Sequence, residues 1–332
     1  MAKAHHEFKK LISTALACAA ISLSSAGCTK QTFGLAPENA SFGQKATFIT
    51  DVDILWVIDT SGSMGPRQAG LAAQLGGFIS NLNATRLNYQ MAVTTMDMGS
   101  AGARGRWIAQ SGTPFILKAD TPDLLSLLQG RIMAGDQGSV LERGMESVRA
   151  ALTPPLVDGV NKGFMRKNSL LVVIFLSDEN DKSAVFDDVA FLDSIHPPLP
   201  FGDKSWVVQF MGVTPDDPSC KTSEWGYSEP GVRYINMAQA SGGAAESICD
   251  ADFGRALTNV NARLKELLVE FPLDRLPNVD TIQVFVNGKK VPKSDTNGWS
   301  YVEAKNSIRF HGEAVPGPDA SINVDFTPQG AK

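Results

Sequence analysis

One aspartate and two serines at alternating positions, Asp59, Ser61 and Ser63, form the pattern D-x-S-x-S directly after an apolar run. Two hydroxyls two residues apart on a tight loop can face one point, and the aspartate adds negative charge beside them. Hard cations such as Mg²⁺ prefer six oxygen ligands and keep several waters. Gly62 lets the backbone approach an ion closely. These residue types predict a site for one divalent cation, Mg²⁺ first, with Mn²⁺ or Ca²⁺ as alternatives.

The elements that must position this loop are strands alternating with amphipathic helices. The strands are expected at 52–58, 89–96, 170–176 and 206–213, with an antiparallel edge strand within 107–117. The helices are marked by apolar residues at helical spacing within 71–82, 141–152 and 253–268. This alternation predicts an α/β fold with a doubly wound, mostly parallel sheet flanked by helices. In such sheets the binding site lies beyond the carboxyl ends of the strands.

The pattern resembles that of von Willebrand factor A-type domains, in which D-x-S-x-S belongs to a metal-ion-dependent adhesion site. The resemblance covers about residues 51–272. In the family, a hydroxyl residue before a later helix and an aspartate after the fourth strand complete the site. Ser139 and Asp178 occupy these places here, although the family usually has Thr where this chain has Ser139. The ligand set implied by the resemblance is Asp59, Ser61, Ser63, Ser139 and Asp178.

The resemblance also implies a role for each ligand. The three serine hydroxyls bind the ion directly, whereas Asp59 and Asp178 act mainly through bound water. Neutral direct ligands leave the ion electron-poor with one open position, which in the family is commonly filled by a carboxylate from a partner. We therefore expect a protein-binding module whose unknown partner offers an Asp, a Glu or a terminal carboxylate.

Each residue of this set also has an interpretation without metal. The D-x-S segment suits a turn after a strand. Ser139 and Glu142 match the S-x-x-E capping box at a helix start. The polar stretch 178–181 suits a solvated turn. Asp97, at the end of another expected strand, is a candidate for an acid that supports the ligands without touching the ion.

The sequence gives little support for catalysis. It lacks H-E-x-x-H, G-x-S-x-G and P-loop patterns. Beyond the first 27 residues its histidines are His196 and His311, both far in sequence from the serines of the expected site. A carboxylate pair among Asp178, Glu179 and Asp181 leaves an exported metal-dependent hydrolase as a minor alternative. We assign no catalytic residue and expect a protein that is not an enzyme.

The first residues predict export. Two lysines precede an apolar segment too short to span a bilayer, and Ser25-Ala26-Gly27-Cys28 follows. This resembles a bacterial lipobox, with Ser25 in place of the usual Leu, and implies a lipid on Cys28; an ordinary secretory signal is the alternative. Thr29 is not the Asp that retains lipoproteins at the inner membrane. We expect a chain that is lipid-anchored to the bacterial envelope, at the outer membrane.

The cysteine count fits an exported protein. Cys18 leaves with the signal peptide and lipidation uses Cys28, so Cys220 and Cys249 remain for one disulfide. Two buried free thiols are the alternative. The net charge of -5, without a basic run, gives no indication of a nucleic-acid partner.

Four segments are expected along the chain. They are a signal peptide at 1–27, a flexible tether at 28–50, a von Willebrand factor A-like domain at 51–274 and a small all-β domain at 275–332. In the last segment the apolar pattern changes to period two, and Asn287-Gly288 marks a hairpin. The function expected for the whole is a membrane-anchored, divalent-metal-dependent module for adhesion or assembly. A structural envelope lipoprotein without a functional metal is the main alternative.

Overall fold

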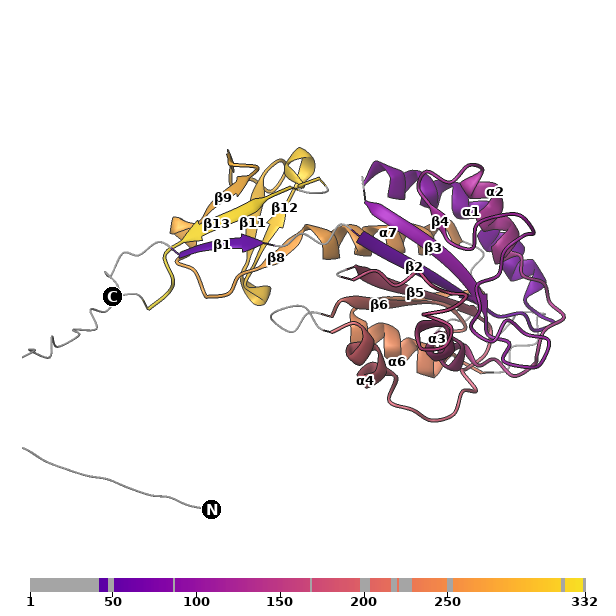
Figure 1. Cartoon of the computed structure of the whole chain (residues 1–332). Coiled ribbons are helices and arrows are strands. Elements are labelled where there is room, and N and C mark those ends of the chain that lie inside the picture. The colour runs from indigo at the N-terminus through magenta and orange to yellow at the C-terminus, as the bar shows by residue number, and fades with distance from the viewer. Residues whose placement is uncertain are drawn as a thin grey trace, which may run out of the picture. The chain divides into compact units, whose positions relative to one another are not determined.

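The computed structural model describes residues 42–46, 51–85, 87–167, 169–197, 204–215, 220, 229–249, 253–317 and 320–330. The expected signal peptide and the lipidation site at Cys28 lie outside the described residues. Within these ranges, no helix combines the length and apolar character that a membrane crossing requires. The described residues form an α/β part and a β part (Figure 1).

The α/β part is built on a six-stranded sheet with the order β4-β3-β2-β5-β6-β7. Its strands are β2 (Asp51–Ile58), β3 (Asn88–Thr95), β4 (Leu117–Lys118), β5 (Leu170–Ser177), β6 (Trp206–Gly212) and β7 (Ala245–Ser247). All neighbouring pairs are parallel except β3 and β4. The central strand β5 is buried along its whole length, as expected for an apolar strand covered on both faces.

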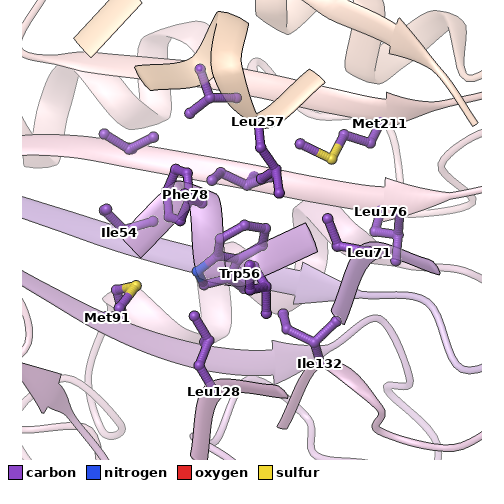
Figure 2. Packing of buried hydrophobic residues seen from close by; sticks show 14 of the residues in the cluster. Ile54, Trp56, Leu71, Phe78, Met91, Leu128, Ile132, Leu176, Met211 and Leu257 are labelled. Atoms are coloured by element: carbon purple, nitrogen blue, oxygen red, sulfur yellow. The ribbon is translucent and has the colours of Figure 1, made fainter. Parts of the chain in front are cut away.

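Helices cover both faces of this sheet (Figure 1). They are α1 (Gly65–Ala84), α2 (Leu124–Ile132), α3 (Gly144–Leu152), α4 (Asp188–Ile195), α6 (Val232–Ser241) and α7 (Phe253–Val269). On one face, Trp56 packs among residues of α1, α2 and α7, including Phe78, Leu128 and Leu257 (Figure 2). On the other face, alternate residues of β2 pack with α3, α4 and α6. The expected fold class, a mostly parallel sheet flanked by helices, is confirmed.

Two elements differ from their sequence-based prediction. The edge strand expected within 107–117 is reduced to Leu117–Lys118, because the preceding segment is a loop held by Trp107, whose ring nitrogen donates to the Asn161 carbonyl oxygen. The helix expected from Leu141 begins at Gly144, and Leu141 lies outside it with 55% of its surface exposed. The cap position of α3 is Arg143, whose own side chain makes no capping bond. The Met145 and Glu146 N–H groups donate instead to the Asp181 and Ser183 side chains, so Ser139 and Glu142 do not form a capping box.

The β part contains two small antiparallel sheets with the orders β1-β13-β9-β10 and β11-β12-β8. Their strands are β1 (Phe42–Ala46), β8 (Glu270–Pro272), β9 (Gln283–Val286), β10 (Lys289–Val291), β11 (Trp299–Val302), β12 (Ser307–Phe310) and β13 (Ile322–Phe326). Single 3-10 turns lie at Val279–Thr281, Glu303–Lys305 and Gly312–Ala314. The hairpin expected at Asn287-Gly288 joins β9 to β10, and both turn residues have positive φ as a type I′ turn requires.

The β part takes strands from both ends of the chain. Strand β1 pairs with β13 from Phe42–Phe326 to Ala46–Ile322. The sequence analysis placed residues 42–46 in a flexible tether, and this prediction is wrong for these five residues. Strand β8 pairs with β12, so this part begins at Glu270, before the expected boundary at 275. Main-chain pairing with a partner almost 300 residues away decides the structure of β1, and no local pattern signals it.

The expected disulfide between Cys220 and Cys249 is confirmed, with 5.1 Å between their Cα atoms. Cys249 follows β7, and its backbone N–H donates to the Ser247 hydroxyl. Both cysteines belong to or pack against the hydrophobic core on the α1 face of the sheet, so the bond fastens the β7 edge to that core.

Candidate metal centre

Asp59 directly follows β2, at the carboxyl-terminal edge of the sheet, and its side chain is fully buried. One carboxylate oxygen, Oδ1, accepts a hydrogen bond from the Ser61 backbone N–H at 2.8 Å. The other, Oδ2, accepts one from the Ser177 hydroxyl at 2.7 Å. Burial raises the pKa of Asp59 to about 6, even though these donors favour the charged form. The first predicted ligand is therefore fixed between its own loop and the end of β5.

The loop after Asp59 turns tightly and brings its two serines together. The Met64 backbone N–H donates to the Ser61 carbonyl oxygen, and the Ser61 and Ser63 hydroxyl oxygens lie 3.4 Å apart. From α1, the buried Gln68 amide donates to the Asp59 carbonyl oxygen at 2.8 Å and so clamps the start of the loop. The two hydroxyls thus face each other, as the spacing of the motif predicts.

Asp178 follows β5 on the same edge of the sheet, beside the serine loop. Burial raises its pKa, whereas a hydrogen bond with the Ser63 hydroxyl lowers it, and the net direction is upward. Its Oδ1 is buried and has no hydrogen-bond partner among the described residues. Four of the five predicted ligands, Asp59, Ser61, Ser63 and Asp178, are therefore brought together.

Backbone hydrogen bonds hold the loop of Ser139 against the D-x-S-x-S loop and Asp97. The preceding Gly138 donates its N–H to the Thr60 carbonyl oxygen at 2.8 Å, inside the D-x-S-x-S loop. A Cβ at position 138 would lie only 2.0 Å from the Thr60 hydroxyl oxygen, so glycine is needed for this approach. The Ser139 N–H donates to Asp97 Oδ2 at 3.1 Å, and its hydroxyl accepts from the Leu141 N–H. Among the described residues, no hydrogen bond joins this hydroxyl to the other four predicted ligands.

Asp97 supports the Ser139 loop. In addition to its bond with the Ser139 backbone, it accepts a hydrogen bond from the Gly99 N–H at 2.7 Å through Oδ1. Its position after β3 agrees with the sequence-based idea of an acid that holds a ligand-bearing loop without itself being a ligand.

Glu142 is a site residue that the sequence analysis missed. It is 1% exposed, and neither of its carboxylate oxygens has a hydrogen-bond partner in the described part of the chain. Burial and, after it, the charges of Asp59 and Glu179 raise its pKa to about 8. Its carbonyl oxygen accepts from the Lys182 N–H at 2.7 Å, which joins its loop to the loop after β5. The S-x-x-E pattern pointed to a helix cap and gave no sign of this burial.

The electrostatics of this edge favour a cation. Asp59, Glu142 and Asp178 all have raised pKa values because they are buried near other carboxyls. The folded chain then holds their protons more tightly than the unfolded chain does. Deprotonation of Asp59 and Glu142 between about pH 4 and pH 8 therefore lowers the free energy of unfolding of the metal-free protein. A bound divalent cation would offset this loss.

The available oxygen atoms suit a cation bound by hydroxyl groups and water better than a cation bound by several carboxylates. No three His, Cys, Asp or Glu side chains of the described ranges are grouped so that they could hold an ion by themselves. The neighbouring hydroxyls of Ser61 and Ser63 and the unpartnered oxygen of Asp178 match the oxygen ligands that Mg²⁺ prefers, and this ion takes its remaining ligands from water. The residues present therefore fit the predicted cation.

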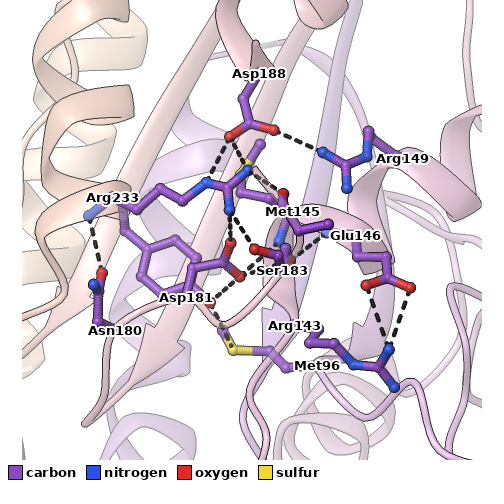
Figure 3. A network of polar contacts seen from close by, with 12 residues as sticks. Met96, Arg143, Met145, Glu146, Arg149, Asn180, Asp181, Ser183, Asp188 and Arg233 are labelled. Carbon is purple, nitrogen blue, oxygen red and sulfur yellow. Dashed lines mark hydrogen bonds and ion pairs between the residues drawn. The ribbon is translucent and has the colours of Figure 1, made fainter. Parts of the chain in front are cut away.

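A network of charged side chains fixes the loop after β5 (Figure 3). The Arg233 guanidinium, from α6, contacts Asp181 Oδ2 at 2.9 Å and Asp188 Oδ2 at 2.6 Å. Asp188 also accepts from Arg149 of α3 at 3.0 Å. The Asp181 side chain is fully buried and accepts from the Ser183 hydroxyl as well. The network ties the loop that starts at Asp178 to two helices.

These contacts weaken the catalytic alternatives. Asp181 is engaged by Arg233, Ser183 and Tyr234, so it is not free to pair with Asp178 or Glu179 as an acid–base couple. His196 is buried between the end of α4 and Ser205, which precedes β6, so it lies at the opposite edge of the sheet. His311 hydrogen-bonds Ser300 within the β part.

Comparisons with solved structures find remote likenesses. No protein-family model and no curated protein matches the chain. Among solved structures, a von Willebrand factor type A protein from Catenulispora acidiphila is 14% identical with a TM-score of 0.41, over 86% of this chain and 59% of that one. The pilus adhesin SpaC from Lactobacillus rhamnosus GG is 13% identical with a TM-score of 0.42, over 86% of this chain and 40% of that one.

A third similar structure is proximal thread matrix protein 1 from the mussel byssus, 15% identical with a TM-score of 0.37 over 68% of this chain and 48% of that one. This chain thus spans less than two thirds of each of these proteins. Their remote similarity leaves the site to be argued from the residues of this chain.

Proposed function

We propose that this chain is a divalent-metal-dependent protein-binding module. In this proposal the hydroxyls of Ser61, Ser63 and Ser139 bind one Mg²⁺ or Mn²⁺ ion directly, and Asp59 and Asp178 act through bound water. The observation that carries the proposal is a set of buried carboxyls with raised pKa values beside two facing hydroxyls, at the edge of the sheet where α/β folds bind ligands. The cation supplies a Lewis-acidic position that a carboxylate of the partner can occupy.

Exposed apolar residues beside this edge support a protein as the partner. Val140 and Leu141 directly follow Ser139 and are 74% and 55% exposed. In the loop after Asp178, Val185 is fully exposed and Phe186 is 54% exposed. Phe186 packs against Arg149 and Phe191, so the exposed apolar pair directly beside a proposed ligand is Val140 and Leu141, and exposed apolar side chains next to a polar centre are typical of interaction surfaces. A small hydrophilic substrate would gain little from them.

Two observations support the metal-free alternative. Asp59 already has two internal donors, and the Ser139 hydroxyl already accepts from the Leu141 N–H. A structural envelope lipoprotein could use these residues only to hold its loops. The buried Asp178 oxygen and the two oxygens of Glu142, all without partners among the described residues, favour the metal-binding proposal over this one.

We expect the metal to control partner capture. The mature chain, immobilised and exposed to an envelope extract in Mg²⁺, should retain one or more proteins that EDTA releases, because the open metal position is lost with the ion. The Asp59→Ala variant should fail to retain them, whereas Ser139→Thr should retain them because it keeps the hydroxyl. The retained proteins are identified by mass spectrometry. Capture that is equal with and without EDTA would contradict metal-dependent binding.

We also propose that the module is anchored to the outer membrane by a lipid on Cys28. The mature N-terminus should begin at Cys28 and carry acyl chains, since several chains are needed for stable anchoring at about 0.8 kcal/mol per buried methylene. Mass spectrometry of the N-terminal peptide checks this, with the Cys28→Ala chain as control. An unmodified thiol at Cys28 in the exported protein would refute the anchor.

A further inference from the structure

Glu142 is a buried acid of the α/β part to which the described loops around it donate no hydrogen bond. Its side chain is 1% exposed, and both carboxylate oxygens lack hydrogen-bond donors among the described residues. Asp53 and Asp181 have donors within the chain, whereas Asp178 Oδ1, like the two Glu142 oxygens, has no hydrogen-bond partner among the described residues. Asp53 accepts from Arg166 and from the Ser169 hydroxyl, and Asp181 accepts from several donors. A buried carboxylate without donors is costly, so Glu142 either keeps its proton and shares it with the neighbouring Glu179 carboxyl or, when charged, needs a partner from outside the chain.

The surroundings of Glu142 indicate that this partner is a cation or its water. The neighbouring charges that act on it most are the carboxyls of Asp59 and Glu179. The cation within electrostatic range is Lys182, whose exposed ammonium instead forms an ion pair with Glu229. Glu142 is therefore influenced by two carboxyls from two other loops, while the ammonium of Lys182 is engaged by Glu229.

The backbone around Glu142 keeps its carboxylate at this place. The Arg143 N–H donates to the Met96 carbonyl oxygen at 3.1 Å, and the Glu142 carbonyl oxygen accepts from the Lys182 N–H at 2.7 Å. The loop is thus fastened on one side to the end of β3 and on the other to the loop after β5. These bonds fix Glu142, on the loop that carries Ser139, between the end of β3 and the loop that carries Asp178.

We propose that Glu142 is a further acidic residue of the metal centre, where its carboxylate accepts hydrogen bonds from metal-bound water and strengthens the binding of a divalent ion. This inference depends on the proposed function. It assigns Glu142 a positioning role toward the ion and does not make it a direct ligand. Acids that hold metal-bound water or ligands typically change metal affinity by about 10–100-fold when they are removed.

The Glu142→Gln variant tests the inference because it keeps the size of the side chain and removes its charge. Titration calorimetry of the mature chain with Mg²⁺ and with Mn²⁺ should show an affinity about 10–100-fold below that of the wild type. Unfolding without metal at a pH above about 8, where Glu142 is charged, should show a stability equal to or above that of the wild type, because a buried charge has been removed. A loss of metal affinity without a loss of metal-free stability distinguishes this role from a structural one.

Two further variants complete the test. Glu146→Gln removes the same charge four residues away, where the carboxylate pairs with Arg143 at the surface, and should bind metal as the wild type does. Glu142→Asp keeps the charge and should recover part of the lost affinity. Equal metal affinity of wild type and Glu142→Gln would overturn this inference alone. If the wild type binds no ion, the proposed function itself fails.

Discussion

Replacing Arg233 with Met is expected to lower the free energy of unfolding by about 3–5 kcal/mol, as is typical when one partner of a buried ion pair is removed. The Arg233 guanidinium contacts Asp181, whose side chain is fully buried, and Asp188, which is 5% exposed. Without it, Asp181 has no counter-charge in direct contact, whereas Asp188 keeps Arg149. The length of Met preserves most of the packing of the arginine side chain, so the loss reports mainly on the charge.

Chemical unfolding of the mature chain measures this effect, and Arg143→Met is the matched control. Arg143 pairs with Glu146 at 3.4 Å, and both side chains are about one third exposed, so its removal should change the stability by less than about 1 kcal/mol. Similar losses in both variants, or a loss below about 1 kcal/mol for Arg233→Met, would show that the network does not hold the loop after β5.

The second large effect is expected for Asp59→Ala, which should lower the affinity for Mg²⁺ and Mn²⁺ by at least about 10–100-fold. The substitution removes the most deeply buried carboxylate of the centre and leaves the Ser61 N–H and the Ser177 hydroxyl without their acceptor. The serine loop then loses both charge and order. Asp59→Asn keeps the shape of the side chain and separates these two causes, because it removes only the charge.

Variants at Ser139 provide the comparison. Ser139→Thr keeps the hydroxyl and should bind metal as the wild type does, whereas Ser139→Ala should bind more weakly. Metal-dependent shifts in thermal stability give an independent reading, since an ion that binds only the folded chain stabilises it by mass action. If Asp59→Ala and Ser139→Ala show the same metal-dependent shift as the wild type, these residues do not bind the ion.

The sheet could be predicted from sequence because its signals are local. The runs that became β2 and β5 are continuously apolar, and the loops after them carry Asp59 and Asp178. In a parallel sheet, neighbouring strands end at the same edge, so the approach of these two residues follows from strand order. The facing hydroxyls of Ser61 and Ser63 follow equally from their spacing.

Other features depend on contacts between distant segments and could not be predicted. Strand β1 exists because residues 42–46 pair with β13, not because of their own pattern. The burial of Glu142 results from backbone bonds to Met96 and Lys182, which lie in other loops. In the same loop, Leu141 is exposed and α3 begins only at Gly144. The helical spacing of the apolar residues had predicted that the helix includes Leu141.

Calorimetric titration of Mg²⁺ and Mn²⁺ into the wild-type mature chain tests the metal centre most directly. The titration is done at about pH 8, above the pKa of about 6 for Asp59, so that this carboxylate is charged. We expect saturable uptake of one ion per chain, with weaker binding by Asp59→Ala in the same buffer. No uptake at millimolar metal, or equal uptake by Asp59→Ala, would contradict a metal centre at this edge of the sheet.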